Sequence, residues 1–294
     1  MRRVLVCGAA ALSLALAPPA SAGTFPGGNG RIAYVQNVAG QPEVFTMTAT
    51  GRDRRQVTNE PTGATAPDWS PDGRSLAFSV GGTWIGVTDA LGAGRKLVSA
   101  DVDGTDPSWS GDGSSFAIAG VQYDPQGNIE DTSIYLLRAD GGGDQRIVDG
   151  SDPVWSPDGS WILFEQTPAT SDFCPGTAAI RPDGSDLHYV VPNYHDESGS
   201  CTGGGSGASF SPDGKRVVYV GPNGRDLYKV SVHGGTARKL KADSDPKHDP
   251  IFSPDGQTIL FTTDSATRTI AAKKGGHERQ LGPAVSQPAW QAMR

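Results

Sequence analysis

Short apolar triplets recur along the chain at a fixed distance behind a polar turn. Each begins three residues after a turn glycine, and the triplets are Leu76-Ala77-Phe78, Phe116-Ala117-Ile118, Ile162-Leu163-Phe164, Val217-Val218-Tyr219 and Ile259-Leu260-Phe261. Short, wholly apolar runs bounded by turn residues predict buried β-strands. Further strand-like runs and glycine turns follow each triplet, so the pattern indicates an all-β chain.

The turns belong to a seven-residue phrase, Pro-x-Trp-Ser-Pro-Asp-Gly, which occurs in five near-complete copies and returns in part near the C-terminus. Its aromatic residue falls at Trp69, Trp109, Trp155, Phe210, Phe252 and Trp290, at intervals of 40, 46, 55, 42 and 38 residues. A period in this range, with four strands per repeat, is typical of propeller blades. We therefore predict an all-β, six-bladed β-propeller of four-stranded antiparallel blades.

The phrase has a structural explanation. Proline sets φ for a β-turn, aspartate caps the turn and glycine accepts a positive φ. This chemistry predicts turn roles for the aspartates of the phrase, which are Asp72, Asp112, Asp158, Asp213 and Asp255. The large aromatic rings are expected to pack as wedges between neighbouring blades.

The two ends of the repeat array are complementary. The first unit starts at Gly30-Arg31-Ile32 without a phrase before it, and the last unit stops after Pro288-Ala289-Trp290. We predict that a C-terminal strand, residues 287–291, completes the N-terminal blade. This pairing closes the ring and leaves no open sheet edge between the first and last units.

The N-terminus has the features of an export leader. Arg2 and Arg3 precede an apolar run from Val4 to Ala17, and Ala20-Ser21-Ala22 forms a small-residue cleavage site. We predict a signal peptide over 1–22, a single propeller domain over 23–294, and a periplasmic or extracellular location. The apolar run is shorter than the roughly 20 residues that span a bilayer, so no membrane insertion is expected.

Charge argues against two classes of partner. The 25 basic residues include Arg2 and Arg3, so 23 remain against 32 acidic residues, a net charge of −9. No cluster of Lys and Arg is present in the sequence, which makes nucleic acid and anionic membranes poor partners. We expect a monomer.

The phrase copies resemble the PD40 (WD40-like) repeats of the TolB-type propeller, and the resemblance covers Gly30 to Trp290. It implies a six-bladed propeller, export, and binding of protein partners at the ends of a central channel. TolB also carries an N-terminal α/β domain, whereas here only Thr24 to Asn29 separate the leader from the first blade. We therefore expect the TolB-like propeller without that domain, and carry over no residue of a Tol-Pal interface.

The longest connections are predicted on one face of the ring, at Gln122–Thr132, Thr167–Gly176 and Asn193–Gly207. Variable loops on a rigid scaffold are where binding usually occurs. Asp106, Asp152 and Asp249 each stand one residue before a phrase proline and are expected at the channel mouth. They could form an acidic funnel for a cation such as calcium or for a basic peptide, or could cap the loops locally.

Other candidates lie on the same predicted face. Cys174 and Cys201 fall in one unit of an exported chain, so we expect a disulfide between them. The candidate partner-binding residues are Tyr123, Asp124, Tyr194, His195, Asp196 and Glu197.

Local enzyme signatures are mostly absent from the sequence. It contains no Gly-x-Ser-x-Gly elbow, no phosphate loop and no His-Glu-x-x-His pair. We expect a non-enzymatic exported scaffold that binds a protein or peptide through the long-loop face and channel mouth, without a required cofactor. Two alternatives stay open: a calcium-dependent hydrolase of the lactonase type, whose ligands would come from distant blades, and a cell-wall glycan-binding module using Tyr123 and Tyr194.

Overall fold

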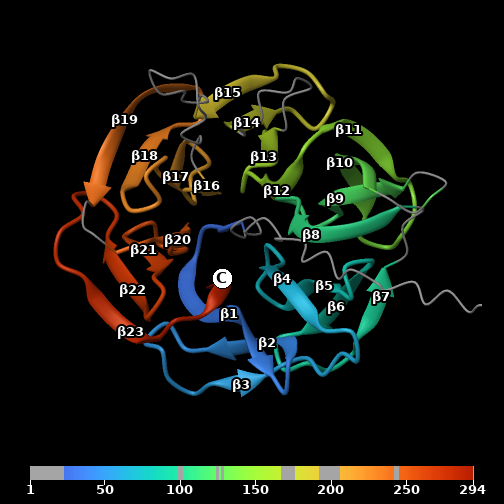
Figure 1. Ribbon diagram of the computed structural model, residues 1–294, viewed down its shortest axis with the longest axis horizontal. Coiled ribbons are helices and arrows are strands. Elements are labelled where there is room, and N and C mark those ends of the chain that lie inside the picture. Colours follow the sequence, from blue (N-terminus) through green and yellow to red (C-terminus); the bar gives the residue numbers. More distant parts are fainter. Residues whose placement is uncertain are drawn as a thin grey trace, which may run out of the picture.

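The computed structural model describes residues 23–98, 102–123, 126, 129–166, 176–191, 206–241 and 245–293. Within these residues the chain forms six four-stranded antiparallel sheets, arranged as blades around a central axis (Figure 1). The predicted all-β, six-bladed propeller is therefore confirmed. The described part of the chain contains no helix that is long and apolar enough to cross a membrane.

In every blade the strand that carries the phrase aromatic lies nearest the axis (Figure 1). From the axis outward, blade 1 contains β24 (Ser286–Met293), β1 (Gly28–Val38), β2 (Gln41–Met47) and β3 (Arg55–Gln56). Blade 2 contains β4 (Ala64–Trp69), β5 (Ser75–Val80), β6 (Trp84–Asp89) and β7 (Lys96–Val98). Blade 3 contains β8 (Asp103–Trp109), β9 (Ser115–Tyr123), β10 (Ile129–Arg138) and β11 (Gln145–Asp149).

The remaining three blades repeat this order. Blade 4 contains β12 (Ser151–Trp155), β13 (Ile162–Gln166), β14 (Gly176–Ile180) and β15 (His188–Val191). Blade 5 contains β16 (Ser206–Phe210), β17 (Arg216–Val220), β18 (Leu227–Ser231) and β19 (Gly234–Lys241). Blade 6 contains β20 (His248–Phe252), β21 (Thr258–Thr262), β22 (Ala266–Ala271) and β23 (Arg279–Pro283).

The core lies between the blades, and the phrase aromatics occupy it as predicted. Trp69 is fully buried and packs with Ala33 and Val44 of blade 1 as well as with Leu76 and Phe78 of its own blade. All six phrase aromatics are buried. Each large ring that leaves water stabilises the contact between two blades by roughly 2 to 3 kcal/mol.

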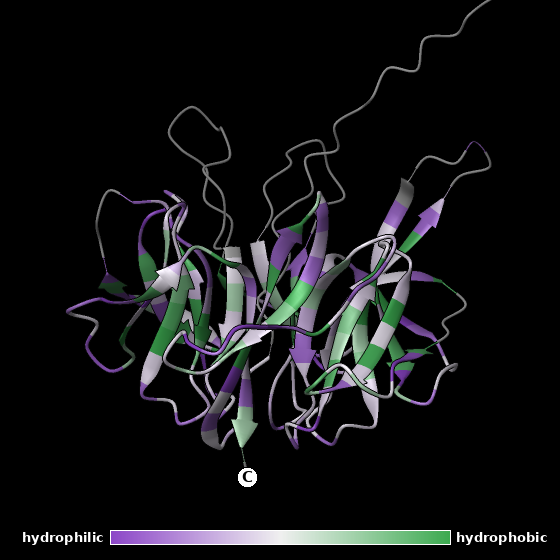
Figure 2. Ribbon diagram, turned by 90° about the horizontal axis from the view of Figure 1, so that it is seen from below, coloured by the Kyte–Doolittle hydropathy of each residue, from purple (hydrophilic) through white to green (hydrophobic). Residues whose placement is uncertain are grey.

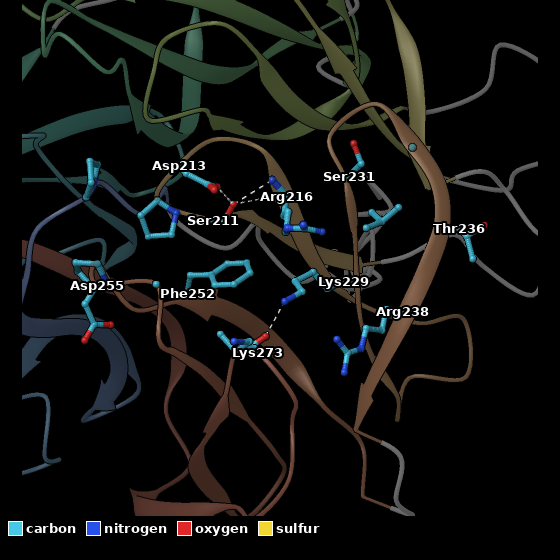
Figure 3. A pocket seen from close by; sticks show the side chains of 17 residues that line it. Ser211, Asp213, Arg216, Lys229, Ser231, Thr236, Arg238, Phe252, Asp255 and Lys273 are labelled. Carbon is cyan, nitrogen blue, oxygen red and sulfur yellow. Dashed lines mark hydrogen bonds between the residues drawn. The ribbon is translucent and has the colours of Figure 1, made fainter.

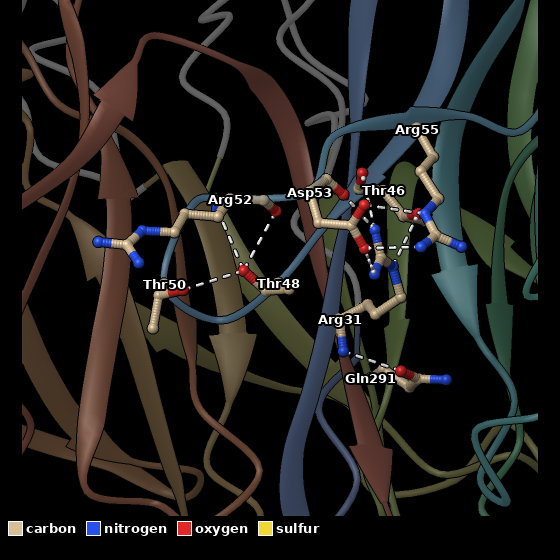
Figure 4. A network of polar contacts seen from close by, with 8 residues as sticks. All are labelled: Arg31, Thr46, Thr48, Thr50, Arg52, Asp53, Arg55 and Gln291. Carbon is tan, nitrogen blue, oxygen red and sulfur yellow. Dashed lines mark hydrogen bonds and ion pairs between the residues drawn. The ribbon is translucent and has the colours of Figure 1, made fainter.

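Strand β24 closes the ring, as the sequence predicts. It pairs antiparallel with β1, with Trp290 opposite Ile32. Gln291 adds two side-chain bonds: its Oε1 accepts from the Arg31 backbone N–H at 2.8 Å, and its Nε2 donates to the Gly73 carbonyl of the neighbouring blade at 2.7 Å. The Arg31 guanidinium in turn contacts Asp53 at 2.9 Å (Figure 4). The closing strand is therefore tied to its own blade, through Arg31, and to blade 2, through Gly73.

The propeller has two different faces, seen edge-on in Figure 2. Each inner strand begins at one face, here called the mouth face. The inner strands of blades 2 to 6 end in their Pro-Asp-Gly-like turns at the other face, here called the turn face. The predicted loop Gln122–Thr132 belongs to the mouth face, but its prediction as a loop is largely wrong. Strand β9 continues to Tyr123 and β10 starts at Ile129, with Asp131 paired to Gln122, so most of this segment is a two-stranded arm.

Candidate functional site

A ring of six unusual backbone positions surrounds the mouth of the channel. One residue near the start of each inner strand has a φ between 47° and 58°, and these residues are Ala66, Asp106, Asp152, Gly207, Asp249 and Gln287. The pairing register shifts at each of these places, as at a β-bulge. We call these six residues the mouth ring. A positive φ is uncommon outside glycine, yet five of these six residues are not glycine. The fold therefore imposes this backbone conformation at the equivalent position of each blade.

Side chains of the mouth ring bridge successive blades. Asp249 Oδ2 accepts the backbone N–H of Gln287 at 3.1 Å, and Gln287 Oε1 accepts the backbone N–H of Ala66 at 2.5 Å. The Asp106 N–H instead donates to Ser79 Oγ at 2.8 Å. The bulges therefore satisfy backbone donors that a regular strand would pair within its own sheet.

Carboxylates gather around Asp152 at this mouth. Burial and the neighbouring Asp152 charge raise the pKa of Asp106 to about 7. The same two causes raise the pKa of Glu165, on β13, to about 8. Burial raises the pKa of Asp249 to about 6, against the lowering effect of the Gln287 N–H. The structure thus brings the three predicted acids to one mouth and adds Glu165, which sequence reasoning missed.

Among the described residues the group is an acidic rim and not a chelating cluster. Within the described ranges, no three His, Cys, Asp or Glu side chains are placed so that they could hold a metal ion. A cavity of about 10 Å³ beside Asp152, Glu165 and Gly207 has room for about one water molecule. Burial disfavours the ionised form of these carboxyl groups. A cation bound at the rim would favour the ionised form through its charge, and would therefore lower their pKa values.

The other predicted site residues divide into two groups. Tyr123 ends β9, with 49% of its surface exposed. The remaining candidates lie outside the described residues and stay predictions: they are Asp124, Tyr194, His195, Asp196, Glu197 and the cysteines Cys174 and Cys201. The leader, 1–22, also lies outside them.

A second concavity opens on the turn face, between blades 5 and 6 (Figure 3). Its volume is about 880 Å³, and its charged lining residues are Arg216, Lys229, Arg238, Lys273, Asp213 and Asp255. Lys229 Nζ donates to the Ala272 carbonyl at 2.7 Å, and burial together with Arg216 and Arg238 lowers the pKa of this lysine. Sequence reasoning missed the groove because its cations come from separate strands and form no local motif.

The geometry defines a class: a six-bladed propeller with a bulged, acid-lined channel mouth. No protein-family model matches the chain, and no curated protein matches it. Solved structures, however, match the chain. TolB from Acinetobacter baumannii superposes with a TM-score of 0.70 at 19% identity, covering 90% of this chain and 67% of that one. A putative TolB from Agrobacterium tumefaciens gives 0.67 at 19% identity, covering 89% and 92%.

An enzyme shares the same architecture. The oligogalacturonate lyase from Vibrio parahaemolyticus superposes with a TM-score of 0.59 at 12% identity, covering 90% of this chain and 78% of that one. Identities this low demonstrate the fold alone. The fold of this chain is therefore a TolB-like propeller, and its function has to be argued from its own residues.

Proposed function

We propose that this protein is an exported, non-enzymatic propeller scaffold that binds a protein or peptide partner at its channel mouth and long-loop face. The observation that carries the proposal is the set of carboxylates around Asp152. Asp106, Glu165 and Asp249 approach it from three blades and have raised pKa values. Burial and mutual repulsion disfavour the ionised form of these acids, so a Lys or Arg side chain from a partner would find favourable electrostatics there.

The rest of the molecule supports this assignment. The expected mature chain has a net negative charge, which favours the approach of a basic segment. The mouth is built on bulged strands that hydrogen bonds tie together from blade to blade, and such a rigid base holds binding groups in place. The predicted leader supports export and, with it, a partner in the periplasm or outside the cell.

The hydrolase alternative has less support. The oligogalacturonate lyase neighbour shares the fold at 12% identity. Among the residues that the structure describes, however, no metal-ligand cluster corresponds to the predicted calcium site. No specific contact therefore favours a catalytic function over binding.

The proposal can be tested by selecting random dodecapeptides on the mature protein. We expect enrichment of sequences with Lys or Arg, and binding to the parent protein that weakens about tenfold or more in the triple variant Asp106→Asn, Asp152→Asn, Asp249→Asn. Asparagine keeps the size of each side chain and the acceptor that Asp249 offers to Gln287. Arg238→Glu, in the turn-face groove, is the matched control and should leave peptide binding unchanged.

Three results would count against the proposal. The first is selection of peptides without basic residues, or with affinity that the triple variant retains. The second is turnover of an oligogalacturonate or a lactone by the parent protein, which would establish an enzyme. The third is loss of binding in the Arg238→Glu control, which would place the partner on the turn face instead.

A further inference from the structure

The first described residues of the chain lie inside the ring of inner strands (Figure 1). Thr24 is fully buried and its Oγ1 donates to the Phe252 carbonyl at 3.1 Å. Phe25, 3% exposed, packs in the cluster that contains Trp109. Farther on, the Gly27 N–H donates to the Pro254 carbonyl at 3.2 Å. The segment Gly23–Gly27 is therefore built into the centre of the fold and contacts several blades.

Asp68 faces this segment and is only 1% exposed. One carboxylate oxygen, Oδ2, accepts the backbone N–H of Trp109 in the next blade at 2.8 Å. The other, Oδ1, makes no hydrogen bond of regular geometry with any described residue. A buried carboxylate oxygen without a partner is costly and calls for an explanation.

The bond between blades does not require a carboxylate. In the next blade Ser108 holds the position equivalent to Asp68, and its hydroxyl accepts the Trp155 N–H at 2.9 Å. The other equivalent positions are Val154, Ser209, Ile251 and Ala289. Among these six positions only Asp68 has an acid, so the blade contact does not account for its second oxygen.

The group beside that carboxylate is the backbone nitrogen of Gly23. Burial raises the pKa of Asp68 well above its ordinary range, and the N–H groups of Trp109, Trp69 and Gly23 oppose this rise. Other acceptors lie near as well: a Cβ at Gly23 would lie 3.4 Å from the Trp155 carbonyl oxygen and 3.7 Å from Ser108 Oγ. The nitrogen of Gly23 thus lies beside the Asp68 carboxylate, and as a peptide nitrogen it has one proton and no charge to offer it.

We propose that cleavage between Ala22 and Gly23 creates an α-ammonium group that binds the Asp68 carboxylate, so that removal of the leader completes the core of the propeller. An export-linked peptidase adds water across this peptide bond: the Ala22 fragment leaves with the new carboxylate, and the Gly23 amine takes up a proton. The resulting ammonium has three N–H donors and a full positive charge. The ammonium donates a hydrogen bond to Oδ1 of Asp68, and its positive charge pairs with the buried carboxylate.

The first test is the chemistry of the N-terminus in the protein exported from cells that express the full chain. Mass spectrometry should give a chain that begins at Gly23. Acetylation of its α-amine should be about tenfold slower in the folded protein than in the denatured one, because a pKa raised by one unit removes about nine-tenths of the reactive neutral amine. A chain that begins at another residue, or an amine as reactive as in the denatured protein, would overturn the proposal.

The second test is a double-mutant cycle on stability. Proteins that begin at Gly23 or keep one extra alanine, Ala22, are compared in the parent and in the Asp68→Ser background. Serine retains the blade contact, as Ser108 does, but has no charge. The extra residue should lower the melting temperature of the parent by roughly 4 °C or more and have little effect in Asp68→Ser. Equal shifts in both backgrounds would show that Asp68 does not bind the terminus.

Discussion

In each Pro-Asp-Gly-like turn, the side chain of the turn aspartate accepts the hydrogen bonds that hold the turn, as Asp112 illustrates. Its Oδ1 accepts from Ser110 Oγ at 2.6 Å, from the Ser114 N–H at 2.9 Å and from Ser114 Oγ at 2.8 Å. The Ser110 hydroxyl, followed by the Ser114 donors, lowers the pKa of Asp112. The other four turn aspartates accept from the serine two residues before them in the same way.

Replacing Asp112 with alanine should therefore destabilise the protein although the residue is far from the mouth. The lost bonds contribute about 1 to 2 kcal/mol together, which lowers the melting temperature by roughly 2 to 6 °C. The matched control is Asp140→Ala, because Asp140 is exposed and pairs only with Arg138 in the described contacts. Thermal unfolding followed by circular dichroism separates the two variants, and equal melting temperatures would contradict the turn role.

These turn residues could be predicted because the chemistry of a turn is local, whereas the mouth ring could not. In the sequence, Asp106, Asp152 and Asp249 precede proline, and this context is compatible with ordinary loop capping. Their positive φ values arise from bulges that only the paired neighbour reveals. The approach of Glu165 to Asp152 also depends on strand pairing, because 13 positions separate the two residues along the chain.

At the level of elements, β24 is the strand on which the ring depends. It is adjacent in the sheet to β1, from the opposite end of the chain, and removing it would expose the inner edge of blade 1. Deleting residues 287–294 should therefore lower the melting temperature sharply, by roughly 10 °C or more, and expose apolar surface. Gln291→Ala, which loses only the contacts to Arg31 and Gly73, should have a much smaller effect. An unchanged melting temperature after the deletion would contradict closure by this strand.

The sequence predicts the strands well where short apolar runs follow turns at a fixed distance. It predicts them less well where polar strands extend beyond the ring. The arm formed by β9 and β10 contains Gln122 and Asp131, whose polarity resembles that of a loop. Only cross-strand pairing shows that they continue the sheet. Such polar extensions have no core to bury, so hydrophobic periodicity does not detect them.

At the scale of the whole molecule, the repeat predicts the ring, but the ring alone does not define a function. Five near-complete copies of one pattern and a partial sixth determine blade number and closure, because each blade needs neighbours to bury its faces. The acids at the mouth and the cations of the turn-face groove come from different blades. Such sites are assembled by the geometry of the ring, and a linear sequence contains no motif for them.

The mouth carboxylates also make the stability of the whole propeller depend on pH. The pKa values of Asp106, Glu165 and Asp249 in the fold are about 7, 8 and 6, above the ordinary values of 3.8 for aspartate and 4.5 for glutamate. Between about pH 4 and pH 8 the native state therefore binds more protons than the unfolded state. The stability associated with these groups is fully present below about pH 4 and is lost as the pH rises toward 8.

We accordingly expect the melting temperature to fall by about 5 °C or more between pH 5 and pH 8. The double variant Asp106→Asn, Glu165→Gln should flatten this dependence, because neutral amides do not titrate. Asp140→Asn, an exposed control, should retain the slope of the parent. Calorimetry at constant ionic strength provides the comparison, and the range starts at pH 5 because turn aspartates such as Asp112, with lowered pKa values, titrate below it with the opposite sign. A parent protein as stable at pH 8 as at pH 5, or a double variant with the parent's slope, would show that these carboxylates do not control stability.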